Sequence, residues 1–463
     1  MNEPAKKLSG PDLARGIALS EVTDGEMLPG HAHGEPVLLL RRAGEMFAIG
    51  THRTHYGAPL ANGMLVDDPV RCPCHQACYS LRTDDALCAP ALDSVASWRV
   101  EQQDGSGYVK LVPAEQKQLP QVAGTPQSIA IVGGGAAGNA AAETLRREGY
   151  SGLITLLSAD EARPCDRPEL SKSILAGTTS AESNPLRPLA FYQANRIDLK
   201  LDAPVASLDT SSRHLRLVDG SHVAFDALLL ATGGEPARLG GVGRNLQHVH
   251  YLHSLADGRA LMASALTAER AVVIGASFID LEVAASLRAR NIEVHVVATD
   301  SVPMEKLLGT NVGNFIRWLH ERHGVTFHLG STAISIDSKG VQLMSGEYLP
   351  ADLVIIGIGV RPMIALAERA GLAIDCGITV NEYLETSVPG IFAAGDIARW
   401  PDRLTGEHIR AEHWVVAERQ GQTAARNMLG RRERFDAVLF FWTEQYDFGL
   451  AFGRSEGNVD ELG

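Results

Sequence analysis

The stretch Ile129–Gly138, with the sequence Ile-Ala-Ile-Val-Gly-Gly-Gly-Ala-Ala-Gly, predicts a strand that leads into a glycine-rich turn and a helix. Gly133, Gly135 and Gly138 form the pattern G-x-G-x-x-G. In this pattern the first glycine makes a tight turn, the second allows close approach of a pyrophosphate, and the third lets the helix pack closely on the strand. The pyrophosphate then lies at the positive end of the helix dipole. The stretch predicts an α/β dinucleotide-binding fold.

The following residues complete this first unit. A helix over 140–147 and a strand over 154–157 are expected, and Asp160 stands about 20 residues after the motif, where an acid can hold a ribose hydroxyl. This order of elements is more specific than the glycine pattern alone, which also occurs in ordinary βα turns. We expect the glycines, Ala136 and Ala137 to contact the dinucleotide.

A second unit of the same kind is predicted over 271–274 (strand), 275–280 (turn), 281–290 (helix) and 294–297 (strand). Two such units predict two dinucleotides, with hydride passing between them. Ser277 and Asp280 replace the second and third glycines, and the extra negative charge of Asp280 is expected to weaken binding. Asp300 is the candidate ribose acid, and no arginine closely follows the second strand to mark a 2′-phosphate, which favours NADH over NADPH. The expected contacts in this turn are Gly275, Ser277, Phe278 and Ile279.

Composition places the 463-residue chain among ordinary globular proteins, with 45% hydrophobic and 21% charged residues and room for about three domains. No apolar run is long enough to span a membrane, and the N-terminus has no signal-peptide pattern, so we expect a cytoplasmic location. The net charge of −13 disfavours nucleic acid and anionic membranes as partners.

Four of the six cysteines lie close together, at positions 72, 74, 78 and 88. Beside histidines, such a cluster favours a metal site over disulfides in a cytosolic protein. No C-x-x-C or C-x4-C pair occurs near the first glycine motif, so a dithiol–disulfide reductase has no evident redox pair. Residues 1 to about 113 show short β-like runs, residues 114–127 predict a linker, and alternating strands and helices follow.

Residues 127–450 resemble the pyridine-nucleotide flavoprotein reductases of the ferredoxin-reductase and apoptosis-inducing-factor type. The motifs that carry this resemblance are Arg167-Pro168-Glu169-Leu170-Ser171-Lys172, Ala231-Thr232-Gly233, Gly357-Ile358-Gly359-Val360-Arg361-Pro362, Thr386 with Ala393-Ala394-Gly395-Asp396, and Glu412-His413-Trp414.

The resemblance implies that FAD is held by the first glycine loop, Arg167 and Lys172, with Asp396 at the ribityl chain. It places Lys172 and Glu282 together at the flavin N5 edge, under the nicotinamide, although such a pair can also be only a structural ion pair. Trp442 falls where the family has an aromatic near the isoalloxazine, and core packing is the alternative. The remaining implied FAD contacts are Ala231, Thr232, Gly233, Gly359, Gly395, Glu412, His413 and Trp414.

The N-terminal region resembles a Rieske domain, whose [2Fe–2S] cluster needs two thiolates on one iron and two imidazoles on the other. His55, Cys72 and His75 occupy ligand positions, but Arg53 occupies the place of the first cysteine. We therefore expect the domain to lack a stable cluster. The histidines at 248, 250 and 253 have no accompanying acid or fourth ligand and are interpreted as solvated loop residues.

The predicted domains are a Rieske-like domain over 1–115, FAD-binding segments over 126–245 and 375–430, an NAD-binding domain over 246–374, and a partial C-terminal domain over 431–463. The predicted function is an FAD-dependent NAD(P)H oxidoreductase that passes electrons from NADH to a ferredoxin or other iron–sulfur acceptor. Two alternatives remain, an apoptosis-inducing-factor-like NADH oxidase or redox sensor and a non-catalytic FAD-binding remnant. A homodimer is a further open expectation.

Overall fold

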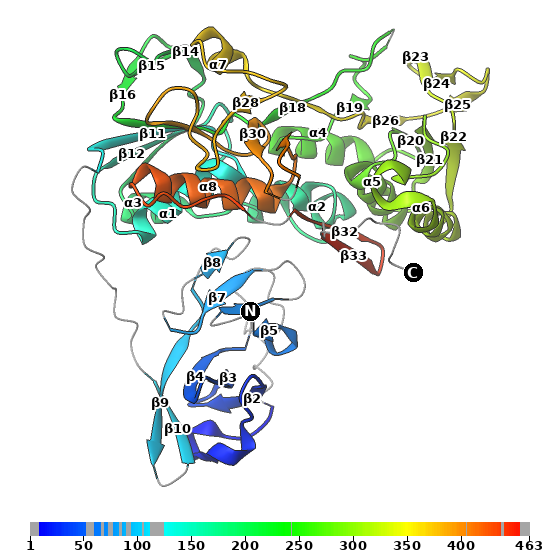
Figure 1. The fold of residues 1–463 in the computed structure, drawn as a ribbon. Helices are drawn as coiled ribbons and strands as arrows, with labels where there is room; N and C mark the ends of the chain where they lie inside the picture. The colour runs from blue at the N-terminus through cyan, green and yellow to red at the C-terminus, as the bar shows by residue number, and fades with distance from the viewer. Residues whose placement is uncertain are drawn as a thin grey trace. The chain divides into compact units, whose positions relative to one another are not determined.

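The computed structural model describes residues 9–51, 60–65, 69–72, 77–82, 86–88, 94–103, 106–111, 125–241, 243–403, 405–436 and 439–453. The chain divides into two compact units, Met1–Pro120 and Gln121–Gly463, whose helices and strands are labelled in Figure 1. Most of the predicted linker, residues 114–124, lies outside the described residues.

The first unit is built of antiparallel strands in two sheets, with the orders β1-β10-β9-β4-β3-β2 and β5-β6-β7-β8. Residues 37–40 of β3 are all buried because both faces of the strand are covered. Leu38 and Leu40 belong to one hydrophobic cluster, whereas Val37 and Leu39 belong to another. The strands are β1 (Ile17–Ala18), β2 (Met27–Ala32), β3 (Glu35–Arg42), β4 (Glu45–Gly50), β5 (Met64–Leu65), β6 (Pro69–Arg71), β7 (Cys78–Ser80), β8 (Ala86–Cys88), β9 (Ser97–Gln103) and β10 (Ser106–Leu111).

The second unit begins with a five-stranded parallel sheet of order β13-β12-β11-β17-β29. Its strands are β11 (Ser128–Val132), β12 (Leu153–Leu157), β13 (Ile197–Lys200), β17 (Ala227–Leu230) and β29 (Ile391–Ala393). The last strand pairs with β17 although about 160 residues separate them in sequence. The chain therefore leaves this sheet, builds other elements, and returns to complete it.

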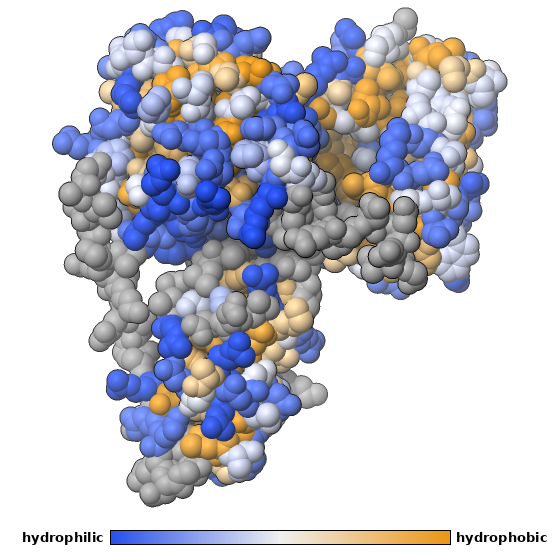
Figure 2. All heavy atoms as spheres, viewed as in Figure 1, coloured by the Kyte–Doolittle hydropathy of each residue, from blue (hydrophilic) through white to orange (hydrophobic). Residues whose placement is uncertain are grey.

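Helices α1 (Ala136–Arg147) and α8 (Trp414–Met428) pack against each other beside this sheet (Figure 1). Small residues allow the close approach: a Cβ atom on Gly421 would lie 2.1 Å from the carbonyl oxygen of Ala137. Residues 136–145 of α1 and most residues of α8 are buried, so both helices are largely interior elements of this unit. In Figure 2 the viewer-facing surface of this part of the molecule is mainly hydrophilic. Within the described residues, no helix is both long and apolar enough to cross a membrane.

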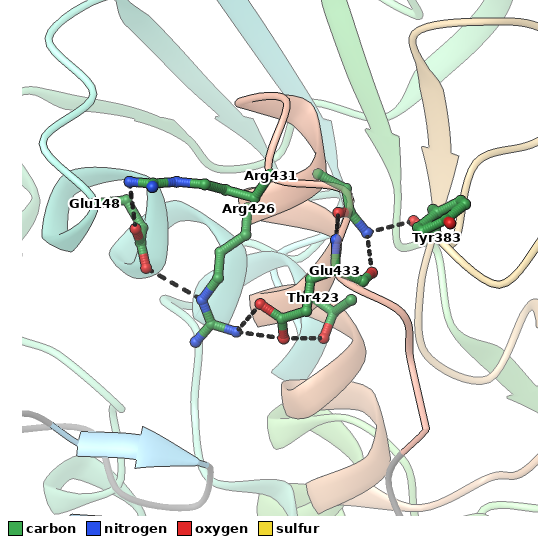
Figure 3. A network of polar contacts seen from close by, with 7 residues as sticks. Glu148, Tyr383, Thr423, Arg426, Arg431 and Glu433 are labelled. Atoms are coloured by element: carbon green, nitrogen blue, oxygen red, sulfur yellow. Dashed lines mark hydrogen bonds and ion pairs between the residues drawn. The ribbon is translucent and has the colours of Figure 1, made fainter. Parts of the chain in front are cut away.

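A network of ion pairs joins the ends of α1 and α8 (Figure 3). Arg426 donates from Nε to Glu148 Oε1 at 3.1 Å and from Nη1 to Glu433 Oε1 at 2.9 Å. Arg431 Nη2 donates to the second oxygen of Glu148 at 3.4 Å, and the hydroxyl of Thr423 contacts Glu433 at 3.3 Å. These contacts fix the C-terminal part of α8 against the end of α1.

A second five-stranded parallel sheet has the order β19-β26-β20-β21-β22. The predicted helix after its glycine turn begins at Phe278 rather than 281, because Ser277 and Asp280 cap its first turn. The elements are β19 (Val249–His250), β20 (Arg270–Ile274), β21 (Glu293–Ala298), β22 (Val325–Leu329), β26 (Leu353–Ile356), α4 (Leu255–Ala265), α5 (Phe278–Ala289) and α6 (Glu305–Arg322).

Two antiparallel pairs position the site. In the first, β18 (Gly234–Pro236), which follows β17 of the first sheet, pairs with β27 (Val360–Pro362), which follows β26 of the second sheet. The second is the hairpin of β32 (Phe440–Gln445) and β33 (Phe448–Gly453), which contacts α5. The predicted division of this unit into FAD, NAD and C-terminal parts stays a prediction. The remaining elements are β14 (Val205–Asp209), β15 (His214–Leu217), β16 (His222–Ala224), β23 (Ala333–Asp337), β24 (Gly340–Leu343), β25 (Tyr348–Pro350), β28 (Ile378–Thr379), β30 (Ala398–Pro401), β31 (His408–Ile409), α2 (Ser173–Ala176), α3 (Leu189–Ala194) and α7 (Ala365–Arg369).

Candidate active site

The first glycine loop shows which glycines the fold requires and which it leaves free. Gly133 has φ +119°, and a Cβ atom there would lie 1.9 Å from the carbonyl oxygen of Ala231. A Cβ atom on Gly138 would lie 1.9 Å from the carbonyl oxygen of Gly133. At Gly135, by contrast, no described atom lies within 4 Å of an added Cβ. This open space at the start of α1, whose first turn carries no acidic residue, fits a pyrophosphate.

The second glycine loop is capped by one of its own side chains. Asp280 Oδ2 accepts hydrogen bonds from the backbone N–H and the hydroxyl of Ser277, at 2.9 and 2.7 Å. Its other oxygen fills the space beside Gly357, where an added Cβ would lie 1.5 Å from it. Only 1% of Asp280 is exposed, and burial raises the pKa of its carboxyl to about 6. The fold thus has room for the side chain of Asp280. The negative charge of its carboxylate would repel a bound diphosphate.

We expect Asp280→Asn to tighten NAD⁺ binding by roughly fivefold at pH 7.5, since about 1 kcal/mol of repulsion between like charges is removed. A pKa near 6 means that the wild-type carboxyl is ionised above pH 6 and protonated below it. Wild-type affinity should therefore fall as the pH rises from 5 to 7.5, whereas the affinity of the Asn variant should stay level. Calorimetric titration with NAD⁺ measures both. Equal affinities at pH 7.5 would show that the charge does not matter.

Arg167 lies at the centre of a polar cluster that joins the segment after β12 to the segment after β19. Its Nη2 contacts Asp160 Oδ2 at 3.3 Å, and its Nη1 donates to His253 Nε2 at 2.8 Å. Burial and the neighbouring guanidinium lower the pKa of His253 to about 4, so the ring is neutral and can accept this bond. Arg167 is therefore held beside Asp160, three residues past the end of β12, where an acid and a cation can bind the ribose and phosphate of one dinucleotide.

The interpretation of the three loop histidines as solvated is wrong. His253 holds Arg167, and His250 Nε2 lies 2.9 Å from the hydroxyl of Ser264. The Nε2 atom of His248 is buried and has no hydrogen-bond partner among the described residues. The partner of His253 lies 86 residues earlier in the chain, whereas that of His250 lies 14 residues later, in α4.

Lys172 and Glu282 form the predicted ion pair. Lys172 Nζ donates to Glu282 Oε2 at 2.9 Å, and also to the carbonyl oxygen of Pro168 at 3.0 Å. The same carboxylate oxygen accepts from the hydroxyl of Ser171 at 2.6 Å, and Oε1 accepts from Thr443 at 2.7 Å. Only 12% of the lysine side chain and 4% of the glutamate side chain are exposed. The pair joins the segment after the first glycine unit to α5 of the second.

Asp396 follows β29 and lies close to the Ala231–Gly233 motif. Burial, with Glu412 nearby, raises the pKa of its carboxyl to about 6. An added Cβ on Gly234 would lie 3.6 Å from Asp396 Oδ2, and Gly395 has φ +78°. Arg410 Nη1 donates to the backbone oxygen of Asp396 at 2.9 Å. This half-buried acid is placed to accept hydrogen bonds from a polyol.

Aromatic rings surround the N-terminus of α8. The ring of His413, the N-cap residue, lies edge-on to Phe441 at 4.7 Å and to Trp442 at 5.1 Å. Phe278, at the start of α5, stacks on Phe441 at 6.2 Å between centroids. The hairpin β32–β33 thus brings Trp442 to the point where α5 and α8 begin.

The other predicted contacts lie along the same loops. Thr232 donates its hydroxyl to the backbone oxygen of Met363 at 2.7 Å, and Asp300 pairs with Lys306 at 2.8 Å. Gly359 has φ +105°, and Ile279 is half exposed at the start of α5. Of the predicted cluster ligands, Cys72 is a buried free cysteine, whereas Arg53, His55 and His75 lie outside the described residues.

Comparison with known proteins identifies both units. Residues 127–421 match the family model described as pyridine nucleotide-disulphide oxidoreductase, and residues 16–99 match the Rieske [2Fe-2S] domain. The chain belongs to the pyridine nucleotide-disulphide oxidoreductase family. Members of this family use FAD and NAD(H), and the predicted fold class, cofactors and oxidoreductase activity of the chain are confirmed.

Relatives within the family match different lengths of the chain. Apoptosis-inducing factor 3 from Homo sapiens is 33% identical over 96% of this chain and 76% of the relative. Rhodocoxin reductase from Rhodococcus erythropolis is 37% identical over 72% of this chain and 79% of the relative. A solved covalent complex of putidaredoxin reductase with putidaredoxin matches with a TM-score of 0.69 and 34% identity, over 71% of this chain and 81% of the other.

Proposed function

We propose that this oxidoreductase takes hydride from NADH and passes electrons to an iron–sulfur acceptor. The Lys172–Glu282 pair is the observation that carries the proposal, because it joins the two dinucleotide units at one buried point. A bound FAD would supply two-electron chemistry toward the nicotinamide and one-electron chemistry toward an iron–sulfur centre. The likeness to the putidaredoxin reductase complex supports a ferredoxin-type partner.

The residues around the pair have separate tasks in this proposal. The first glycine loop, Asp160 and Arg167 bind the diphosphate and ribose of FAD, and Asp396 accepts hydrogen bonds from its ribityl chain. The ammonium group of Lys172 stabilises negative charge that develops on the flavin during hydride transfer. Glu282, held by three donors, orients Lys172 and excludes water from the junction.

The absorbance spectrum of the purified protein, before and after NADH, tests the proposal. A flavin spectrum that NADH bleaches within seconds, together with fast cytochrome c reduction once a ferredoxin is added, is the expected result. A flavin that NADH leaves unchanged would overturn the proposal and support a non-catalytic FAD binder.

A second candidate is an NADH oxidase or redox sensor, and the match to apoptosis-inducing factor 3 along 96% of the chain favours it. Slow reduction by NADH into a long-lived complex with a broad long-wavelength band, unaffected by ferredoxin, would select this candidate. A cytoplasmic location belongs to the main proposal, because NADH is supplied inside cells, and a homodimer is a separate part of it. Cell fractionation and light scattering test them.

We further propose that the Rieske domain of the wild-type chain lacks a stable cluster, because Arg53 replaces a thiolate with a permanent positive charge. Electron paramagnetic resonance after dithionite reduction should show no Rieske signal from the wild type. Arg53→Cys should gain the signal with about two irons per chain, and adding Cys72→Ser should abolish it again. A stoichiometric signal from the wild type would contradict this prediction.

A further inference from the structure

A continuous line of hydrogen bonds runs from the C-terminal hairpin to the Lys172–Glu282 pair. Tyr446 Oη lies 3.1 Å from His320 Nδ1, and His320 Nε2 lies 2.8 Å from Gln445 Oε1. Gln445 Nε2 donates to Thr443 Oγ1 at 3.2 Å, and Thr443 donates to Glu282 Oε1 at 2.7 Å. His320, Gln445 and Thr443 are all buried, with at most 2% of each exposed.

The chemistry of each group fixes the direction of every bond in this line. Glu282 is held by Lys172 and accepts as a carboxylate, so the hydroxyl of Thr443 must donate to it. Thr443 then accepts from the amide N–H of Gln445, whose oxygen accepts from the Nε2–H of His320. Burial lowers the pKa of His320 to about 4, so the ring is neutral and its Nδ1 accepts from the Tyr446 hydroxyl. All four bonds therefore point toward Glu282.

This arrangement is unsuited to carrying protons, since the amide of Gln445 cannot readily take up and release one. It is suited to fixing a carboxylate, because hydrogen bonds aligned in series polarise and strengthen one another in a dry interior. The charged neighbours of Glu282 include Lys172, its ion-pair partner, and Asp280, two positions earlier in α5. Without the Thr443 donor, one oxygen of a buried carboxylate would lose its partner.

The backbone conformation of Tyr446, in the turn of the hairpin, indicates that its side-chain contacts matter to the protein. Tyr446 has φ +60°, a conformation that costs a non-glycine residue about 1 kcal/mol or more. Its ring nevertheless stacks on His323 at 3.7 Å between centroids, and its hydroxyl reaches His320. A glycine would suit this turn better, so the tyrosine is explained by its contacts with α6.

We propose that Thr443, Gln445 and His320 are positioning residues, which hold Glu282 so that it orients Lys172 for hydride transfer. This inference rests on the proposed function of the pair. Apart from Trp442, the C-terminal hairpin and α6 contribute no predicted cofactor contact. In this inference they nevertheless help to set the rate of flavin reduction.

Stopped-flow reduction of the FAD-loaded full chain by NADH tests the inference. Thr443→Val should lower the limiting rate about tenfold while changing the NAD⁺ dissociation constant less than twofold. Thr443→Ser keeps the hydroxyl and should restore the rate to within twofold of the wild type. Thr144→Val is the matched control, because Thr144 is equally buried in α1 and its hydroxyl has no partner among the described residues.

A second measurement reads the line of bonds without any turnover. Nuclear magnetic resonance of the full chain labelled with ¹⁵N-histidine should show His320 as the neutral Nε2–H tautomer throughout pH 6 to 8. A Nδ1–H tautomer, a Thr443→Val variant as fast as the wild type, or a Thr443→Ser variant as slow as Thr443→Val would each overturn the inference. Absence of reduction in the wild type itself would instead overturn the proposed function, and this inference with it.

Discussion

Gly135→Leu is expected to yield a folded protein that has lost FAD. A Cβ atom at this position meets no described atom of the protein within 4 Å, so a side chain can start there without a backbone clash. The space that the leucine fills is the one assigned to the FAD pyrophosphate at the start of α1. We therefore expect FAD content below about a tenth of the wild-type value.

Gly138→Leu is the matched control for this prediction. Its Cβ would lie 1.9 Å from the backbone oxygen of Gly133, so this variant should fail to fold, whereas Gly135→Leu should keep the wild-type circular dichroism spectrum. Absorbance at 450 nm per mole of protein gives the FAD content. A Gly135→Leu protein that is as yellow as the wild type would show that the pyrophosphate binds elsewhere.

Lys172→Ala is expected to slow flavin reduction by about 100-fold while weakening NADH binding by only a few-fold. Loss of a preorganised charge at a developing negative charge typically costs about 10² to 10³ in rate. The variant also leaves Glu282 buried without its cation, although Ser171 and Thr443 still donate to it. Stopped-flow absorbance at saturating NADH gives the limiting rate, and its concentration dependence gives the affinity.

Lys200→Ala controls for loss of a lysine as such, because Lys200 lies in an exposed pair with Asp198 at 3.7 Å and should leave the rate unchanged. An unchanged limiting rate in Lys172→Ala would mean that the pair with Glu282 only stabilises the fold. A loss of thermal stability in Lys172→Ala but not in Lys200→Ala, with the rate unchanged in both, would point the same way.

Local patterns in the sequence predicted the parts of this site that one short segment encodes. The first glycine loop was predicted residue by residue, since each glycine's task follows from its position in the turn. The start of α5 was placed three residues late, because Asp280 was treated as a fault in a glycine motif. The structure shows that it forms a capping box with Ser277.

The missed contacts of Glu282 and Arg167 join distant segments. Thr443 stands beside Trp442 in the sequence, yet nothing there indicates that it reaches Glu282, 161 positions earlier. Likewise, His253 was set aside among loop histidines, because its partner Arg167 belongs to another part of the chain. Ser171 also donates to Glu282, and it lies in the motif Arg167–Lys172. Because it adjoins Lys172, this donor could have been predicted from the sequence.

The late return of β29 to the first sheet has a consequence for the order in which the protein can fold during synthesis. The strand β17 leaves the ribosome about 160 residues before its partner β29 does. At about 5 to 20 residues per second, its open edge stays uncovered for roughly 8 to 32 seconds. The second sheet is encoded almost entirely within that interval, so it can be complete first. We therefore expect nascent chains released before residue 391 to present an unpaired edge strand to chaperones, and full-length chains to need them least once α8 has emerged.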